Sequence, residues 1–349
     1  MKIQEKRFYM KLLSKTYGVL LISVVLLFTL QNSQAQDSTY VDLLDFNATN
    51  SVNWVNQIPS LKGETKKSNK GWFKRLLLGK SDITTLQKPV GMIGFDHADC
   101  IIFDQGNGTI FIAEDNKLEI PKFLRKDETY YPSLVGACML PDQRILFTDS
   151  KLNKIFSFSA DRKQVTELNS TLELTQPTGI AFNNSTNQVW VVETGLHRIT
   201  ILDPFGNFYK TIGTRGTGKA EFNFPTSIWI DKNGLAYVVD ALNYRIQIFD
   251  AEGHFISMFG ENGNGTGYLA SPKGIATDSH GNIYIVDALF HGVQIFDAQG
   301  NYLYQFGTQG SDPREFWMPS GIYIDAKDHI YVADSYNSRI QVFELNHSQ

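Results

Sequence analysis

The sequence is poor in cysteine: Cys100 and Cys138 are the only two among 349 residues, and they form no C-x-x-C pair. Without a C-x-x-C-H motif, the chain has no attachment site for a c-type haem. The two cysteines are either small buried residues or the halves of one disulfide, and the pattern leaves both readings open.

The sequence also lacks the short motifs that mark common catalytic sites. It contains neither a G-x-S-x-G nucleophile turn nor a G-x-x-x-x-G-K-[ST] phosphate loop. Acidic residues outnumber basic ones beyond the first 35 residues. Residues 1–35 carry a net charge of +4. The whole chain has a net charge of −4, so the residues after position 35 together carry −8. Nucleic acid is therefore not an expected partner, because such binding depends on neutralising phosphates.

Residues 1–35 predict an export signal. A basic stretch precedes the apolar run Tyr17–Leu30, and Ser33 and Ala35 are the small residues expected before a cut after Ala35. The apolar run has 14 residues, and a membrane-spanning helix needs about 20. A cleaved signal is thus favoured over a retained signal anchor. Either one places the rest of the chain outside the cytoplasm, in the periplasm, the envelope or the extracellular space.

Residues 36–80 predict a tether whose basic end, residues 62–80, places lysines beside Trp72, Phe73 and Leu76. Such an amphipathic element docks on a membrane or on a partner protein. The alternative is that its apolar part packs against the folded domain that follows.

The rest of the chain is built from a repeated unit. Five copies share a proline, and successive prolines are 45, 48, 47 and 47 residues apart. These prolines are Pro132, Pro177, Pro225, Pro272 and Pro319. A weaker copy without the proline begins near Ala98. A fixed period of this size indicates a repeat architecture, and the six copies span 98–131, 132–168, 177–213, 225–260, 272–307 and 319–345.

Each copy contains four short runs of β-branched and aromatic residues, which are too short for helices. Turns that pair Asp or Asn with Gly separate the runs, as in tight hairpins. Four antiparallel strands make one blade, and six blades packed radially make an all-β, six-bladed β-propeller occupying residues 81–349. The sixth copy stops before its outermost strand, so we expect residues 81–95 to supply this closing strand.

The unit resembles the NHL repeat. The matching residues of one copy are Pro225, Asp231, Gly234, Tyr237, Val238, Asp240, Asn243, Arg245, Ile246, Gln247 and Phe249. The resemblance covers about Ala98 to Leu345. It implies a propeller of NHL-type repeats and leaves the function open, because one fold carries many functions.

In a propeller the first strands of all blades begin on one face, around a central channel. The residue after each repeat proline is therefore expected at the channel rim, with Asp99 at the aligned position of the first copy. These residues are Asp99, Val135, Thr178, Thr226, Lys273 and Ser320. Neighbouring loops are expected to add His197, Arg198, Tyr244, Arg245, Phe290, His291, Tyr336 and Arg339.

This rim differs from those of enzymes with similar folds. Peptidyl-amidoglycolate lyases resemble NHL propellers and hold zinc with histidines at such positions, and calcium-dependent lactonase propellers use converging acidic and amide side chains. The predicted rim has neither set, so no metal or cofactor is expected there. We interpret His197 and His291 as loop substitutions. The recurring pairs Asp240/Arg245 and Asp334/Arg339 we interpret as structural braces.

Two classes of function remain. The first is an exported, non-catalytic binding or scaffolding propeller whose channel face holds a protein, peptide or glycan partner. The second is a lyase or hydrolase of the NHL-like propeller type with an unfamiliar active site. RNA binding, known for some NHL domains, is disfavoured by the export signal and the acidic charge.

Overall fold

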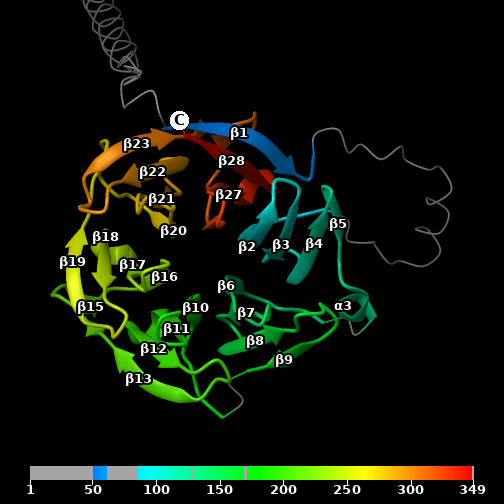
Figure 1. Ribbon diagram of the computed structural model, residues 1–349, viewed down its shortest axis with the longest axis horizontal. Coiled ribbons are helices and arrows are strands. Elements are labelled where there is room, and N and C mark those ends of the chain that lie inside the picture. Colours follow the sequence, from blue (N-terminus) through cyan, green and yellow to red (C-terminus); the bar gives the residue numbers. More distant parts are fainter. Residues whose placement is uncertain (1–49, 61–84, 127–128, 169–170, 348–349) are drawn as a thin grey trace, which may run out of the picture. The chain divides into compact units, whose positions relative to one another are not determined.

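The computed structural model describes residues 50–60, 85–126, 129–168 and 171–347. They form six four-stranded antiparallel sheets, arranged as the blades of a ring around a central channel (Figure 1). The predicted six-bladed β-propeller of NHL-type repeats is confirmed. The predicted signal, residues 1–35, lies outside the described residues. So does the predicted tether, apart from residues 50–60. Within the described ranges, no helix has the length and apolarity needed to cross a membrane.

We number the blades 1 to 6 in chain order. Blade 1 comprises β2 (Pro89–Asp96), β3 (Asp99–Asp104), β4 (Thr109–Glu114) and β5 (Lys117–Glu119). Blade 2 comprises β6 (Leu134–Met139), β7 (Ile145–Asp149), β8 (Lys154–Phe158) and β9 (Val165–Glu167). Blade 3 comprises β10 (Pro177–Asn183), β11 (Gln188–Glu193), β12 (Arg198–Leu202) and β13 (Phe208–Ile212). Blade 4 comprises β16 (Pro225–Ile230), β17 (Ala236–Asp240), β18 (Arg245–Phe249) and β19 (Phe255–Phe259). Blade 5 comprises β20 (Pro272–Thr277), β21 (Ile283–Asp287), β22 (Gly292–Phe296) and β23 (Tyr302–Phe306). Blade 6 comprises β26 (Ile322–Ile324), β27 (His329–Asp334), β28 (Arg339–His347) and β1 (Asn50–Ile58).

Short elements connect some of the blades. They are the helix α3 (Lys122–Lys126), the paired strands β14 (Thr214–Arg215) and β15 (Glu221–Phe222), and the paired strands β24 (Thr308–Gln309) and β25 (Glu315–Phe316). The 3-10 turns η1 (Thr194–Leu196), η2 (Ala241–Asn243) and η3 (Ser335–Asn337) lie within blades 3, 4 and 6, between the second and third strands.

The burial pattern explains why the short apolar runs become strands. Every residue of β17 and of β21 is buried, because these inner strands lie between two neighbouring blades. The outermost strand β19 has no fully buried residue. The turn between β18 and β19 needs Gly253, whose φ of 88° is in the left-handed region that favours glycine.

The hydrophobic core lies between the blades. One buried cluster joins blades 1, 2 and 6 and includes Ile93, Phe147 and Tyr331. At this seam a Cβ atom on Gly94 would lie 2.3 Å from the ring of Tyr331. A residue without a side chain therefore allows blades 1 and 6 to pack closely.

The closing strand is β1, and the prediction that residues 81–95 form it is wrong. β1 adds to β28 as the outermost strand of blade 6, so both ends of the propeller sequence lie side by side (Figure 1). Residues 89–96 form β2, the innermost strand of blade 1, and Pro89 is the proline that the first copy was thought to lack. That copy begins 43 residues before Pro132, so its predicted boundary at residue 98 was one strand too late.

Val52 and Val55 allow a test of the closing strand. Val52 is 5% exposed within the core between blades 5 and 6, whereas Val55 is 36% exposed. Val52→Asp should destabilise the propeller by about 3 kcal/mol, since it buries an unpaired carboxylate. Val55→Asp should change the free energy of unfolding by less than about 0.5 kcal/mol. Equal chemical-denaturation midpoints for the two variants would show that β1 does not close the ring.

Candidate functional site

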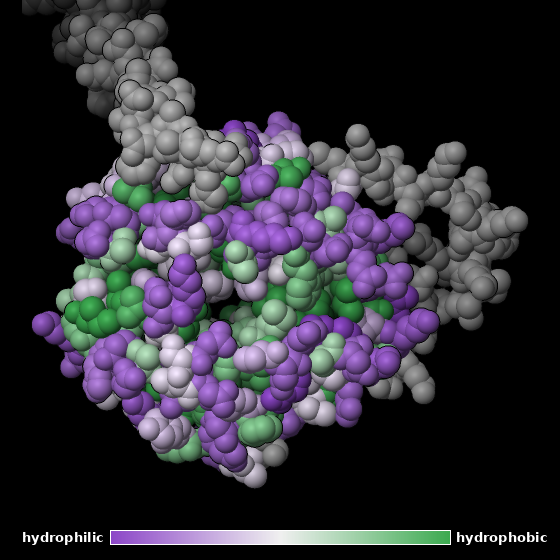
Figure 2. Space-filling view, in the orientation of Figure 1, coloured by the Kyte–Doolittle hydropathy of each residue, from purple (hydrophilic) through white to green (hydrophobic). Residues whose placement is uncertain are grey.

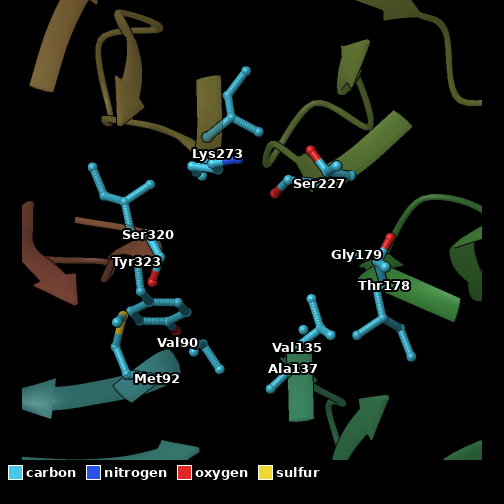
Figure 3. A pocket seen from close by; sticks show the side chains of 18 of the residues that line it. Val90, Met92, Val135, Ala137, Thr178, Gly179, Ser227, Lys273, Ser320 and Tyr323 are labelled. Carbon is cyan, nitrogen blue, oxygen red and sulfur yellow. The ribbon is translucent and has the colours of Figure 1, made fainter. Parts of the chain in front are cut away.

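The first strands of the blades enclose a cavity of about 680 Å³ at the centre of the ring. Figure 2 shows an opening at this centre, and Figure 3 shows side chains from several blades around one open space. The repeat prolines set the geometry, since each first strand begins near its proline and carries the following side chains along the channel wall.

The cavity wall is mainly apolar and hydroxyl-bearing. Among its described residues, the charged side chains are Lys88 from blade 1 and Lys273 from blade 5. The other polar residues of the wall are Gln105, Thr178, Asn184, Thr226, Ser227, Ser320, Tyr323, Ser335 and Tyr336. Two amines among neutral groups give the cavity a positive character, so it is suited to an anionic ligand group.

The hydroxyl groups on the wall differ in how they are paired. Thr178 Oγ1 lies 2.8 Å from Thr194 Oγ1, and Ser320 Oγ lies 2.6 Å from Ser335 Oγ. Thr226 Oγ1 is buried and has no hydrogen-bond partner within the described ranges. The reason lies in blade 4, where Ala241 occupies the position of Thr194. An unpaired buried hydroxyl costs free energy, so blade 4 lacks the stabilising hydroxyl pair that blades 3 and 6 have.

The structure brings together six of the predicted site residues. Val135, Thr178, Thr226, Lys273, Ser320 and Tyr336 all line the cavity. The prediction for Asp99 is wrong, because β3 begins at Asp99, at the opposite end of the blade from Pro89. There its Oδ1 accepts a hydrogen bond from the Asp115 N–H at 2.8 Å. Val90, which follows Pro89, takes the rim position of blade 1.

The two predicted loop histidines do not line the cavity, because each one links its blade to the next. His197 Nδ1 accepts a hydrogen bond from the Phe224 N–H at 3.0 Å, and His291 Nδ1 accepts one from the Met318 N–H at 3.1 Å. Burial lowers the pKa of His197, which favours the neutral ring that can accept this bond. Both residues have a positive φ, as has Tyr244 at the same position of blade 4. The interpretation as loop substitutions fits these contacts.

The predicted arginines also brace the blades, and they do not line the cavity. Arg245 Nε donates to Asp240 at 2.8 Å, and its other nitrogens donate to backbone carbonyls of the loop before blade 4. Arg339 is bound in the same way to Asp334, and it also donates to Gln57 of β1 at 2.9 Å. The interpretation of the recurring Asp/Arg pairs as structural is supported by these bonds.

The remaining predicted loop residues also lie outside the cavity lining. Arg198 pairs with the buried Glu193 at 2.7 Å. Tyr244 packs against the hydrophobic core between blades 4 and 5, and Phe290 is half-buried. Tyr336 is therefore the one loop residue of the prediction that the structure places on the cavity wall.

Each blade buries a carboxylate at the end of its second strand, and sequence analysis recognised it in Asp240 and Asp334 but missed it in the other four blades. It is fully buried in all six blades and accepts backbone N–H groups from the segment before the first strand of its own blade. These residues are Asp104, Asp149, Glu193, Asp240, Asp287 and Asp334. The recurring acidic residue at the end of an apolar run was the available signal.

The cysteines form no disulfide in the structure. Cys100 is buried, and Cys138 is half-buried on the cavity wall. Desolvation raises the pKa of both thiols, so they stay protonated and unreactive at neutral pH.

The fold is that of a six-bladed β-propeller, and its central cavity is the candidate site. Residues 316–343 match the family described as NHL repeat, and residues 259–286 match the family described as Beta-propeller repeat. The chain is thus a propeller of NHL-type repeats. A search of curated proteins gave no match.

Several solved structures share the fold at low sequence identity. Virginiamycin B lyase from Staphylococcus aureus is 15% identical, with a TM-score of 0.52, over 74% of this chain and 95% of that one. An auxiliary nutrient binding protein from Bacteroides thetaiotaomicron is 14% identical, with a TM-score of 0.59, over 75% and 70%. Another from Bacteroides ovatus is 15% identical, with a TM-score of 0.57, over 75% and 70%. At these identities the similarity concerns the fold.

Arg245 and Arg144 provide a matched test of the structural braces. Arg245→Ala should cost about 3–5 kcal/mol, because it leaves the buried carboxylate of Asp240 without its cation. Arg144 pairs with Asp142 at 2.7 Å, but the Asp142 side chain is 54% exposed, so Arg144→Ala should cost less than about 1 kcal/mol. Urea denaturation of both variants measures the difference. Equal costs would contradict the bracing role of Arg245.

Proposed function

We propose that the chain is an exported, non-catalytic binding propeller whose central cavity takes an anionic group of a peptide or glycan. The observation that supports this most directly is the pair Lys88 and Lys273 on an otherwise uncharged described wall. An amine beside hydroxyl donors favours a carboxylate, a phosphate or a sulfate.

The dimensions of the site suit a ligand of limited size. A cavity of about 680 Å³ lies within the range of about 300–1,000 Å³ that is usual for small-molecule and cofactor sites. It accommodates a few amino acid or sugar units, and a larger partner would insert one end. Apolar groups such as Val90, Met92 and Tyr323 surround the polar ones (Figure 3). They favour a ligand that also carries apolar surface.

An aromatic pair extends the site at its mouth. The rings of Trp317 and Tyr336 are stacked, with centroids 6.4 Å apart and an angle of 27° between their planes. They are 50% and 59% exposed, and Tyr336 also lines the cavity. Exposed aromatic faces hold sugar rings and apolar side chains with little loss of conformational entropy. We assign this pair to the part of the ligand that lies outside the cavity.

The proposed place of action is outside the cytoplasm, because residues 1–35 have the pattern of an export signal. The basic segment 62–80 would attach the propeller to a membrane or to a partner protein. Peptides and glycans that carry acidic groups are available ligands in the cell envelope and beyond it.

Lys273→Gln tests the proposal. Arrays of peptides and oligosaccharides, each with acidic and neutral members, should select acidic ligands. Lys273→Gln should weaken their binding by about tenfold, the equivalent of one exposed charge-assisted contact. Lys163→Gln is the matched control, since Lys163 is 80% exposed and lies far from the cavity lining. High salt should weaken binding by the original chain.

The same experiment distinguishes the alternative function. Bound ligands recovered after incubation should have an unchanged mass. Their cleavage or elimination would favour the lyase or hydrolase reading instead. Selection of neutral ligands, or equal binding by Lys273→Gln and Lys163→Gln, would contradict recognition of an anion at this site.

A further inference from the structure

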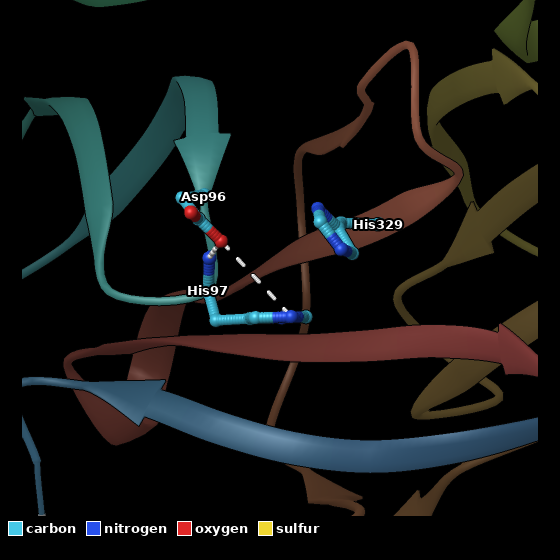
Figure 4. A group of neighbouring side chains, drawn as sticks. All are labelled: Asp96, His97 and His329. Carbon is cyan, nitrogen blue, oxygen red and sulfur yellow. Dashed lines mark hydrogen bonds and ion pairs between the residues drawn. The ribbon is translucent and has the colours of Figure 1, made fainter.

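Two histidines and an aspartate meet at the junction of the first and last blades, away from the cavity lining. The end of β2 contributes Asp96, the turn that follows contributes His97, and the start of β27 contributes His329 (Figure 4). One ligand-type atom from each of the three side chains lies within 4.8 Å of those of the other two. Nothing in the proposed ligand-binding function requires this cluster.

His329 is oriented by a carboxylate. Its side chain is 6% exposed, and its Nδ1 lies 2.8 Å from Oδ2 of Asp325. A neutral imidazole that donates from Nδ1 keeps a lone pair on Nε2. Metal-binding histidines commonly have this arrangement, in which a carboxylate holds the ring in position and increases its basicity.

His97 has an imidazole without a hydrogen bond in the described part of the chain. Its Nδ1 is buried and has no partner, and its Nε2 is 4.0 Å from Oδ1 of Asp96, beyond hydrogen-bond range. The ring centroids of His97 and His329 are nevertheless only 4.0 Å apart. Two rings this close would repel each other if both were protonated, whereas neutral rings can share a cation.

Asp96 supplies the third donor. Its side chain is 54% exposed, and its Oδ1 accepts the backbone N–H of His97 at 2.7 Å. The exposed carboxylate therefore lies beside the two imidazoles, and an oxygen donor with two nitrogen donors is a set that zinc accepts.

We propose that Asp96, His97 and His329 bind one divalent transition-metal ion, such as Zn²⁺, which clamps blade 1 to blade 6. Two imidazoles and one carboxylate suit zinc, whereas calcium prefers six or more oxygen donors. Tetrahedral coordination needs donor atoms about 3.3–3.5 Å apart. Rotation of the partly exposed side chains of Asp96 and His97 would close the present gap, with water as the fourth ligand.

The position of the cluster gives the ion a mechanical role. Asn56 of the closing strand β1 donates to the carbonyl oxygen of His97 and to Oδ1 of Asn116, each at 2.8 Å. The turn that carries His97 is therefore already held by the strand that closes the ring. A metal ion would add a second link between the same two blades and should raise the thermal stability of the propeller.

The test is a Zn²⁺ titration of the full chain without a histidine tag, after EDTA and dialysis. Calorimetry should give one site, and a 100-fold excess of Zn²⁺ over its Kd should raise the melting temperature by about 5 °C or more. Co²⁺ substituted for Zn²⁺ should show the visible absorption of a tetrahedral ion. Calcium should have no effect.

Two variants remove the proposed ligands without disturbing the turns. His329→Asn should retain the bond to Asp325, because Asn282 makes the equivalent bond to Asp278 in blade 5 at 2.7 Å. His97→Ala changes a half-exposed turn residue. Each variant should weaken Zn²⁺ binding by more than about tenfold, because loss of even a group that only orients a ligand costs about that much.

His254→Asn is the matched control. His254 pairs with Asp250 at 2.9 Å with the same sequence spacing as His329 and Asp325, but its side chain is 77% exposed and it lies outside the cluster. This variant should bind Zn²⁺ as the original chain does. The proposal is overturned if the original chain binds no Zn²⁺ at about 100 μM. It is also overturned if His97→Ala and His329→Asn keep full affinity, or if only His254→Asn loses it.

Discussion

The propeller depends on one buried carboxylate in each blade. This carboxylate, at the end of the second strand, accepts backbone N–H groups from the chain that enters the first strand, and in blades 3, 4 and 6 it also pairs with an arginine. An ionised group without solvent is costly unless it is paired and hydrogen-bonded. In each blade the segment before the first strand supplies these hydrogen bonds. The same bonds fix where the first strand begins, and with it the row of residues that line the cavity.

Much of the fold was predictable because the same physical solution is repeated. In blades 3 to 6 the proline and the short apolar runs recur, and turns that run from Asp to Gly recur in blades 3 to 5, so the strands and the number of blades followed from the period. The closing strand was not predictable in this way. β1 is a single strand, NSVNWVNQI, with no copy of the repeat around it, and its partner β28 is far away in sequence. Blade 1 was misaligned because the turn between β2 and β3 is short and lacks the Asp-x-x-Gly pattern that marks this turn in blades 4 and 5.

The positions of the cavity-lining residues were predictable from the sequence, but their hydrogen-bond partners were not. Counting from the repeat prolines identified Thr178, Thr226, Lys273 and Ser320, which the structure places on one wall. The same count cannot show that Thr178 has a hydroxyl partner while Thr226 has none, because the partner comes from a different strand. The approach of His97 to His329 was hidden for a similar reason, since these residues are at opposite ends of the repeat series.

Blade 6 combines three strands from the end of the propeller sequence with β1 from its beginning, and this has a consequence for the order of folding. Gln57 and Arg339 form a hydrogen bond across 282 positions of sequence. Contacts of such range carry a large loop-closure entropy and form slowly. The ring cannot be completed until almost the whole chain has left the ribosome, and until then its first blade has an uncovered flank.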